Sequence, residues 1–289
     1  MIVLTKGSSV ATLLPHLGGA IGSFTVDGRP ILRPTPAGTD NPLETACFPL
    51  VPYANRIADG RFTFAGLDYA LPCNVAGFAH PLHGLGWLKP WNVEQQDEDS
   101  VTINCSHAAD AHWPWDWSAR QHFMLQDGAL HVLLEIQNCA TTAMPCGLGQ
   151  HPYFVREHDA RLHFDALGVW LNDSGMIPSQ PAAADHFGDF AQGAVPQATS
   201  LTDNCWFGWT GTATLQNVTL SSDEATFLHI FAPPGESFLC IEPTTQMPDG
   251  FNRNEGAGGI VLEPGSSAKM GMTIRTPRSV AAVGTEVNL

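Results

Sequence analysis

Glycine and proline recur along the whole chain and leave room only for short secondary-structure elements. The 28 glycines and 22 prolines are spread over 289 residues, and no linker rich in them divides the chain. Three strand-like runs carry a two-residue turn with glycine second: Asp27-Gly28, Ala65-Gly66 and Asp127-Gly128. Type I′ turns need positive φ at both central residues, so such pairs are typical of antiparallel hairpins. The pattern predicts an all-β protein.

Between these turns, apolar and β-branched residues form nine strand or hairpin segments. They occupy residues 23–33, 61–71, 100–106, 122–138, 161–167, 213–222, 226–234, 237–243 and 260–276. No stretch with the apolar spacing of a helix exceeds three turns. Residues 172–200 are the least strand-like part, and we expect a long surface loop there. We expect one antiparallel β domain over residues 1–289, built as a large sandwich.

Composition is that of a globular chain. Hydrophobic residues make up 44% and charged residues 14%, and no long apolar run occurs. Residues 1–18 contain one lysine and no sustained apolar segment, so we expect no secretory signal. The seven cysteines are odd in number, scattered and without a C-x-x-C pair. This pattern favours buried free thiols in a reducing cytoplasm over disulfides or a zinc site.

The charge balance limits the partners. The formal net charge is −15, with three lysines and ten arginines. A surface of this sign repels phosphate backbones, so nucleic acid is an unfavourable partner. Phosphorylated metabolites are disfavoured for the same reason.

Two histidine-proline segments carry the first candidate residues. In "HPLHGLGW" (80–87), His80 and His83 could bind metal, but the i,i+3 spacing does not place both on one face of a strand. Alternatively, Trp87 forms an apolar wall for a sugar ring while a histidine bonds its hydroxyls. A turn with a satisfied histidine is a further reading.

The segment "GLGQHPYF" (147–154) holds another imidazole in a rigid turn. Pro152 biases His151 toward an extended backbone, while Gly147 and Gly149 let another group approach closely. With Tyr153 beside it, the His151 side chain could act as a general acid near neutral pH.

Three further polar residues lie in or next to strand-like runs. Arg56 in "ANRIADGRF" could hold a hydroxyl with its planar guanidinium, or be an ordinary surface arginine. Asp203 in "SLTDNCWFGW" could face a pocket or cap a turn. Glu242 in "FLCIEPTTQMPDGFN" could face a pocket, where desolvation makes it a base, or lie on an edge strand. Glu263 in "VLEPGS" has a similar context, but it leads into a Pro-Gly turn and is expected at a solvent-facing strand end.

Five motifs in order resemble the aldose 1-epimerase (galactose mutarotase) family: "NRIADGRF", "HPLHG", "GLGQHPYF", "LTDNCW" and "CIEPTTQMPDGFN". The N-terminal "LGGAIGSFTVDGRPILRP" is also similar to that family's opening hairpin. The resemblance implies a β-supersandwich fold, the interconversion of α and β anomers of free hexoses, and no cofactor.

The resemblance also implies a role for each residue. Arg56 and Asp203 would bind sugar hydroxyls, and His83 would contact the region of the ring oxygen or a hydroxyl. His151 would be the general acid and Glu242 the general base. Two positions depart from the family pattern: "HPYF" continues as "VRE" where Asn-Leu is common, and "HGLGW" has one glycine where "HGG" is common.

Three alternatives stay open. A hexose-6-phosphate 1-epimerase would need cations at the pocket mouth. A non-catalytic sugar-binding β-sandwich would not need His151 and Glu242 together. A glycoside hydrolase could use Asp203 and Glu242 as its two carboxylates, but would leave His151 without a role.

Overall fold

The computed structural model describes residues 1–196, 199–253 and 259–277. Within these residues the regular structure consists of β-strands and five short 3₁₀ turns, without an α-helix. The turns are η1 (Pro42–Glu44), η2 (Ala58–Gly60), η3 (Gly86–Leu88), η4 (Phe190–Gln192) and η5 (Gly250–Asn252). None of the described segments is a helix long and apolar enough to cross a membrane. The predicted all-β class is confirmed.

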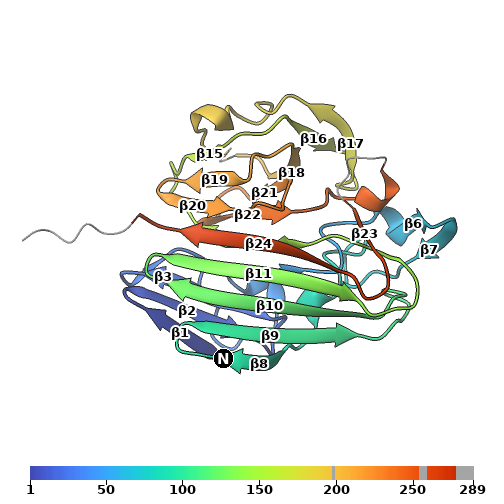
Figure 1. Cartoon of the computed structure of the whole chain (residues 1–289). Helices are drawn as coiled ribbons and strands as arrows, with labels where there is room; N and C mark the ends of the chain where they lie inside the picture. The colour runs from blue at the N-terminus through green and yellow to red at the C-terminus, as the bar shows by residue number, and fades with distance from the viewer. Residues whose placement is uncertain (197–198, 254–258, 278–289) are drawn as a thin grey trace, which may run out of the picture.

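An eight-stranded antiparallel sheet forms one layer, in the order β15-β19-β20-β24-β11-β10-β9-β8 (Figure 1). Its strands are β8 (Asn92–Gln96), β9 (Ser100–His107), β10 (Trp117–Gln126), β11 (Ala129–Asn138), β15 (Leu162–Phe164), β19 (Thr212–Leu215), β20 (Val218–Ser221) and β24 (Ser267–Arg275). In β10 and β9, buried side chains alternate with more exposed ones. One face of this sheet therefore covers the core while the other faces solvent.

A second eight-stranded sheet has the path β17-β16-β18-β21-β22-β13-β5, with β14 also paired to β22. Its strands are β5 (Pro49–Leu50), β13 (Gly149–Gln150), β14 (Tyr153–Val155), β16 (Gly168–Asn172), β17 (Pro178–Ala182), β18 (Thr202–Phe207), β21 (Phe227–Ala232) and β22 (Phe238–Thr244). The central strands β18, β21 and β22 are buried almost throughout. Both faces of this sheet are therefore covered, which explains why β21 and β22 read as largely apolar runs.

Three smaller antiparallel units complete the fold. A four-stranded sheet contains β1 (Ile2–Lys6), β2 (Ser9–Leu14), β3 (Ala20–Val26) and β4 (Arg29–Pro30). The hairpin β6 (Arg61–Phe64) and β7 (Leu67–Ala70) and the pair β12 (Met144–Cys146) and β23 (Ile260–Leu262) lie outside the main sheets.

The main hydrophobic core joins the two large sheets. Leu134 and Ile136 of β11 and Leu228 and Ile230 of β21 are all buried in this one cluster. Because side chains alternate along a strand, the odd-numbered residues of β21 point to the opposite face of its sheet. That opposite face carries the candidate site.

All three predicted turn pairs join adjacent antiparallel strands. In Asp27-Gly28 and Ala65-Gly66 both residues have positive φ, as a type I′ turn requires. In the third pair, Gly128 has φ 76°, whereas Asp127 lies outside the positive-φ region. The hairpin there is correctly predicted, but the turn type is not.

Two expectations about individual segments were wrong. Residues 172–200 are not a loop throughout, because they contain β17 and η4. This strand carries Pro178 and Pro181 and lies at the edge of its sheet, where a missing N–H is tolerated. Residues 197–198 of the expected loop lie outside the described residues.

All seven cysteines are free, but Cys73 and Cys139 are exposed rather than buried.

Candidate active site

All five residues predicted from the sequence line one cavity of about 230 Å³. These are Arg56, His83, His151, Asp203 and Glu242. The other lining residues are Leu43, Asn55, Phe78, Leu82, Tyr153, His229 and Phe231. The cavity is smaller than the roughly 300–1,000 Å³ typical of sites for drug-sized ligands, which favours a compact ligand.

Three cavity residues come from adjacent strands of the second large sheet. Asp203 lies on β18, His229 on β21 and Glu242 on β22, and His229 is the direct cross-strand neighbour of Glu242. Glu242 is within its strand rather than at the strand's end, and its strand is interior to the sheet. The turn-cap reading of Asp203 and the edge-strand reading of Glu242 are therefore both excluded.

His151 is positioned by close backbone packing around the glycines that precede it. Gly149 pairs with Leu50 on one side and Thr244 on the other. A Cβ atom at this position would lie 2.8 Å from side-chain carbons of both neighbours. The His151 N–H donates to the carbonyl oxygen of Phe48 at 3.0 Å. The close approach expected at this glycine is confirmed.

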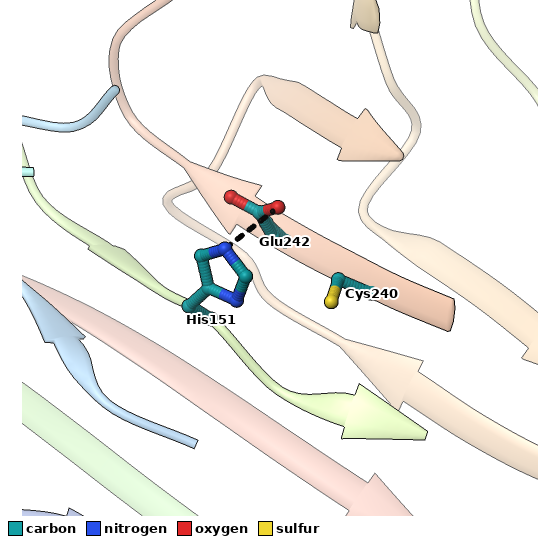
Figure 2. A group of neighbouring side chains, drawn as sticks. All are labelled: His151, Cys240 and Glu242. Atoms are coloured by element: carbon teal, nitrogen blue, oxygen red, sulfur yellow. Dashed lines mark ion pairs between the residues drawn. The ribbon is translucent and has the colours of Figure 1, made fainter. Parts of the chain in front are cut away.

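His151 and Glu242 are in direct contact (Figure 2). The His151 Nε2 atom lies 3.2 Å from Glu242 Oε1, and both residues are buried. Burial raises the pKa of Glu242 well above its usual range, and the nearby Asp203 charge adds to this effect. Burial also lowers the pKa of His151 to about 3. Both shifts disfavour charge, so the pair rests as a neutral imidazole beside a protonated carboxyl.

The other polar atom of each partner is unpaired. His151 Nδ1 and Glu242 Oε2 are buried and have no hydrogen-bond partner in the described part of the chain. Unpaired buried polar atoms are costly, so their presence at a cavity is typical of a site that exchanges hydrogen bonds with a ligand.

Cys240 lies next to this pair, and the three ligand atoms are within 4.8 Å of one another (Figure 2). The sequence spacing did not reveal this group as a metal-ligand set. A cation would require Cys240 as a thiolate, yet burial and the Glu242 charge raise the pKa of that thiol well above its usual range. The fully buried Cys240 packs among Phe48 and Tyr153 instead of lining the cavity. These residues therefore fit a hydrogen-bonded pair beside an apolar thiol better than a metal site.

Two residues that line the cavity have left-handed backbone, Asn55 (φ 59°) and His83 (φ 58°). Such conformations are uncommon outside glycine and cluster at functional sites. The Asn55 N–H donates to His83 Nδ1 at 3.2 Å. His83 Nδ1 is thus an acceptor, so we assign the proton of the neutral ring to Nε2. Burial, together with His151 and Arg56, lowers the pKa of His83 well below 6.5.

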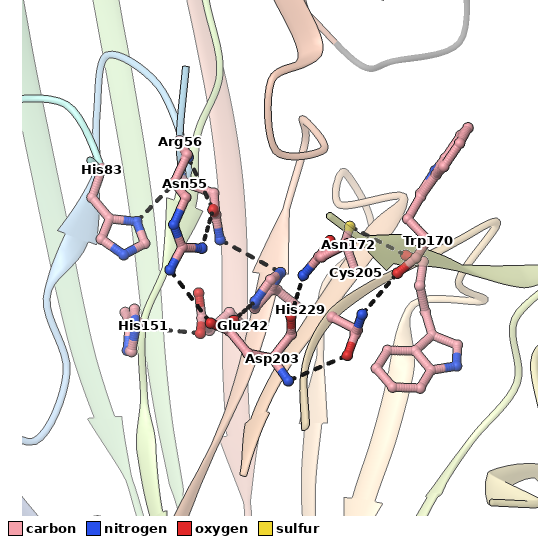
Figure 3. A network of polar contacts seen from close by, with 12 residues as sticks. Asn55, Arg56, His83, His151, Trp170, Asn172, Asp203, Cys205, His229 and Glu242 are labelled. Atoms are coloured by element: carbon pink, nitrogen blue, oxygen red, sulfur yellow. Dashed lines mark hydrogen bonds and ion pairs between the residues drawn. The ribbon is translucent and has the colours of Figure 1, made fainter. Parts of the chain in front are cut away.

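A ring of hydrogen bonds links Asn55, Arg56, Asp203 and His229 (Figure 3). Arg56 Nη1 donates to Asn55 Oδ1 at 3.1 Å, and Arg56 Nη2 lies 3.4 Å from Asp203 Oδ2. His229 Nε2 lies 2.6 Å from Asp203 Oδ1. Burial tends to raise the pKa of Asp203, but the hydrogen bond from His229, followed by the Arg56 charge, lowers it below its usual range. Asp203 is therefore held ionised.

One sequence-based interpretation of the cavity was wrong. Trp87 does not form its wall, because the indole is buried and packs on Phe48 with ring centroids 5.2 Å apart. Phe78, Leu82 and Phe231 supply the apolar lining instead. His80 also lies outside the cavity, where its Nδ1 accepts a hydrogen bond from the Asp59 N–H. Glu263 is exposed, as expected.

Sequence reasoning missed two polar cavity residues, Asn55 and His229. Asn55 precedes Arg56 in the quoted motif but received no role. His229 interrupts the apolar run "TFLHIFA" in the same way that Glu242 interrupts "FLCIEP". An isolated polar residue in a strand that is apolar on both faces is the signal that could have revealed it.

Comparisons with known proteins give a family match and several structural matches. The family model for aldose 1-epimerase matches residues 1–275. The uncharacterised Escherichia coli protein YphB is 32% identical over 279 residues, which cover 89% of this chain and 92% of YphB. A crystal structure from Escherichia coli K12 has a TM-score of 0.89 at 30% identity, covering 96% of this chain and 98% of that one.

A more distant structure shares the fold. The GalM/aldose epimerase homologue from C. elegans has a TM-score of 0.81 at 20% identity, and the match covers 96% of this chain and 98% of that one. Together with the two packed sheets, these matches confirm the predicted β-supersandwich.

Proposed function

The chain belongs to the aldose 1-epimerase family, and we propose that it interconverts the α and β anomers of a free aldose. The observation that carries this proposal is the direct contact between His151 and Glu242, 3.2 Å apart inside a small cavity. Arg56, His83 and Asp203 surround this pair with hydrogen-bonding groups. A proton donor and a proton acceptor beside groups that bind hydroxyls are what ring opening requires.

The proposed reaction moves two protons and breaks one bond. Glu242 as carboxylate takes the proton of the anomeric hydroxyl while protonated His151 gives its proton to the ring oxygen. The bond between C1 and the ring oxygen breaks, leaving an aldehyde and a new hydroxyl. Rotation about C1–C2 and reclosure by the reverse transfers yield the other anomer. Each well-placed proton transfer contributes typically ~10²–10⁴-fold.

The proposed roles of Glu242 as base and His151 as acid require charges that the two residues do not carry at rest. At rest the shared proton belongs on Glu242, because burial raises the pKa of this carboxyl and lowers that of His151. Transfer across their 3.2 Å contact gives the carboxylate and imidazolium without changing the total number of protons. Hydrogen bonds from the sugar hydroxyls to the unpaired Glu242 Oε2 would favour this transfer.

The remaining polar groups hold the ring. His83 Nε2–H and the Arg56 guanidinium are donors, and the lone pairs of Asp203 are acceptors. The apolar side chains of Phe78, Leu82 and Phe231 offer a surface for the carbon-bound hydrogens of the sugar. Because the same contacts serve both anomers, they support reaction in either direction.

The charge of the cavity favours a neutral sugar over a hexose 6-phosphate. Arg56 is the one lysine or arginine among the described residues that line the cavity, and its guanidinium already contacts Asp203. We expect far higher kcat/KM with free glucose and galactose than with their 6-phosphates. Equal or better turnover of glucose 6-phosphate would favour the phosphosugar alternative.

Polarimetry tests the proposal directly. Freshly dissolved α-D-glucose and α-D-galactose should reach anomeric equilibrium faster with the protein than without it. An unchanged rate for both sugars, together with measurable binding, would favour the non-catalytic sugar-binding alternative.

We also propose a cytoplasmic location on the basis of the seven free thiols, which cell fractionation can test.

A further inference from the structure

We propose that His229 is a positioning residue that holds Asp203 in the orientation and ionised state in which it accepts hydrogen bonds from the sugar. The inference rests on the proposed function, and it assigns a role to a residue outside the catalytic pair. His229 lies on β21 between the strands that carry the two cavity carboxylates, and it is 3% exposed.

The contacts determine which His229 nitrogen carries the proton. Asn55 Oδ1 accepts from the Arg56 backbone N–H at 2.9 Å and from Arg56 Nη1 at 3.1 Å. The Asn55 amide group therefore directs Nδ2, a donor, toward His229 Nδ1 at 3.5 Å. With Nδ1 as the acceptor, the proton of a neutral His229 ring lies on Nε2, which faces Asp203 Oδ1 at 2.6 Å.

His229 makes the shorter of the two contacts that hold the Asp203 carboxylate. Arg56 Nη2 reaches the other oxygen at 3.4 Å, near the limit of a useful hydrogen bond. Without His229, the carboxylate would be free to rotate about a single long contact. With it, both oxygens are fixed, and each retains a lone pair for a sugar hydroxyl.

The charge of Asp203 also acts on the catalytic pair, His151 and Glu242. The ionised Asp203 raises the pKa of Glu242, and Arg56 lowers it. The titratable and charged groups around Asp203 are Arg56, His151, His229 and Glu242. By keeping Asp203 ionised, His229 helps to keep the resting proton on the His151–Glu242 pair.

The test compares His229→Phe, which removes the donor but keeps a ring, with His229→Gln, which retains a donor. His229→Phe should raise KM for D-galactose by at least ~10-fold, the effect of losing a hydrogen bond to a charged group. It should also move the acidic limb of kcat/KM to higher pH, because Asp203 loses the interaction that lowers its pKa. His229→Gln should recover part of KM.

The matched control is His131→Phe. His131 is a half-buried histidine on β11 whose Nδ1 bonds the Thr273 hydroxyl, in the other large sheet. This variant should keep the KM and pH profile of the unmodified enzyme. If His229→Phe matches this control in KM and pH profile, the proposal is rejected.

A double-mutant cycle decides the question if His229→Phe does not fold. His229→Gln, Asp203→Asn and the double variant are compared by KM and by calorimetric binding of 1,5-anhydro-D-galactitol, which has no anomeric hydroxyl. If His229 acts through Asp203, His229→Gln should have no further effect once Asp203 is Asn. Full additivity would overturn the assignment.

The same measurements separate this inference from the proposed function. If the unmodified protein neither accelerates mutarotation nor binds the analogue, the proposed function fails first. If it does both and the His229 variants behave like the control, only the role of His229 is rejected.

Discussion

The two carboxylates of the cavity are neighbours with opposite ionisation. Asp203 receives hydrogen bonds from His229 and Arg56 and stays charged, whereas Glu242 contacts His151 and is driven toward its neutral form by burial. Environments that push two nearby carboxyl pKa values apart are typical of sites that separate a binding role from a proton-transfer role. This difference supports Glu242 rather than Asp203 as the group that exchanges protons.

Replacing Glu242 should therefore affect the rate more than the stability. Glu242→Gln keeps the shape and the hydrogen-bonding reach but removes the base, so kcat should fall by at least ~10²-fold, with little change in Tm. The exposed Glu263, whose sequence context is similar, is the control, and Glu263→Gln should leave kcat within a few-fold. Polarimetric rates and thermal unfolding check both variants, and a near-normal rate in Glu242→Gln would reject the acid–base mechanism.

Acid should destabilise the protein partly through His151. Its pKa is about 3 in the folded protein, against 6.5 ordinarily, so below pH ~6.5 the unfolded chain binds a proton that the folded protein does not. The associated stability is fully present above pH 6.5 and is lost as the pH falls toward 3. Between pH 7 and pH 5 the loss is on the order of 2 kcal/mol for one such histidine.

Urea unfolding at pH 7 and pH 5 measures this contribution. His151→Gln should lose less stability than the unmodified protein over this interval, because glutamine does not titrate. Equal losses in the two proteins would contradict the neutral state assigned to His151.

Prolonged dialysis against EDTA should leave the anomerisation rate unchanged. The reason is that Cys240 disfavours the thiolate form and Glu242 and His151 already bond each other. The polarimetric rate before and after dialysis is the measurement, with zinc added back as a control. A loss of activity that zinc restores would overturn the metal-free interpretation.

The residues of the site were partly predictable because their local contexts are unusual. Arg56, His83, His151, Asp203 and Glu242 lie in motifs that the family resemblance assigns. The partners of Asp203 were not predictable, since Arg56 is 147 residues away in the sequence. The pairing of His229 with Asn55 spans 174 residues. Only the folded sheet brings such groups together.

At the scale of elements, β13 connects His151, the proposed general acid, to the sheet. Gly149 is fixed between Leu50 of β5 and Thr244 of β22, two residues before His151. Gly149→Ala should force these neighbours apart, at a cost of about 1–3 kcal/mol. The displacement should also lower kcat, because His151 and Glu242 are carried by the two segments that separate.

Gly271→Ala provides the matched control. A Cβ at Gly271 of β24 meets its nearest atom at 3.5 Å, an ordinary contact. Its stability should change by less than about 0.5 kcal/mol. Urea unfolding and kcat are measured for both variants, and equal behaviour would show that the packing around Gly149 does not position the site.

Two of the strands that the sequence did not predict, β18 and β17, were missed for different physical reasons. In β18, residues 202–206 are buried whichever face they point to, so the alternation that identifies half-exposed strands is absent. In β17, two prolines counted against a strand, but the edge position accommodates them. By contrast, β10 and β11 were predicted because a turn pair and clear alternation occur together.

At the scale of the whole molecule, both large sheets contribute side chains to the main hydrophobic core, which includes Leu134 of β11 and Ile230 of β21. We therefore propose that residues 1–289 form one domain that unfolds in a single cooperative transition. Calorimetry should give equal calorimetric and van't Hoff enthalpies. Tryptophan fluorescence and far-UV circular dichroism should give coincident unfolding curves, and two resolved transitions would indicate independent units.

The place of β24 has a consequence for how the protein is made. Residues 267–275 lie between β20 and β11, with Ala129 of β11 opposite Arg275. These residues are translated after all the other strands of the sheet. The strands β15, β19 and β20 therefore cannot be joined to β8–β11 until β24 is available. Nascent chains that stop short of β24 leave two sheet edges unpaired, and chaperones or like chains can pair with such edges. Pairing of these nine residues with β20 and β11 is thus the step that closes the sheet.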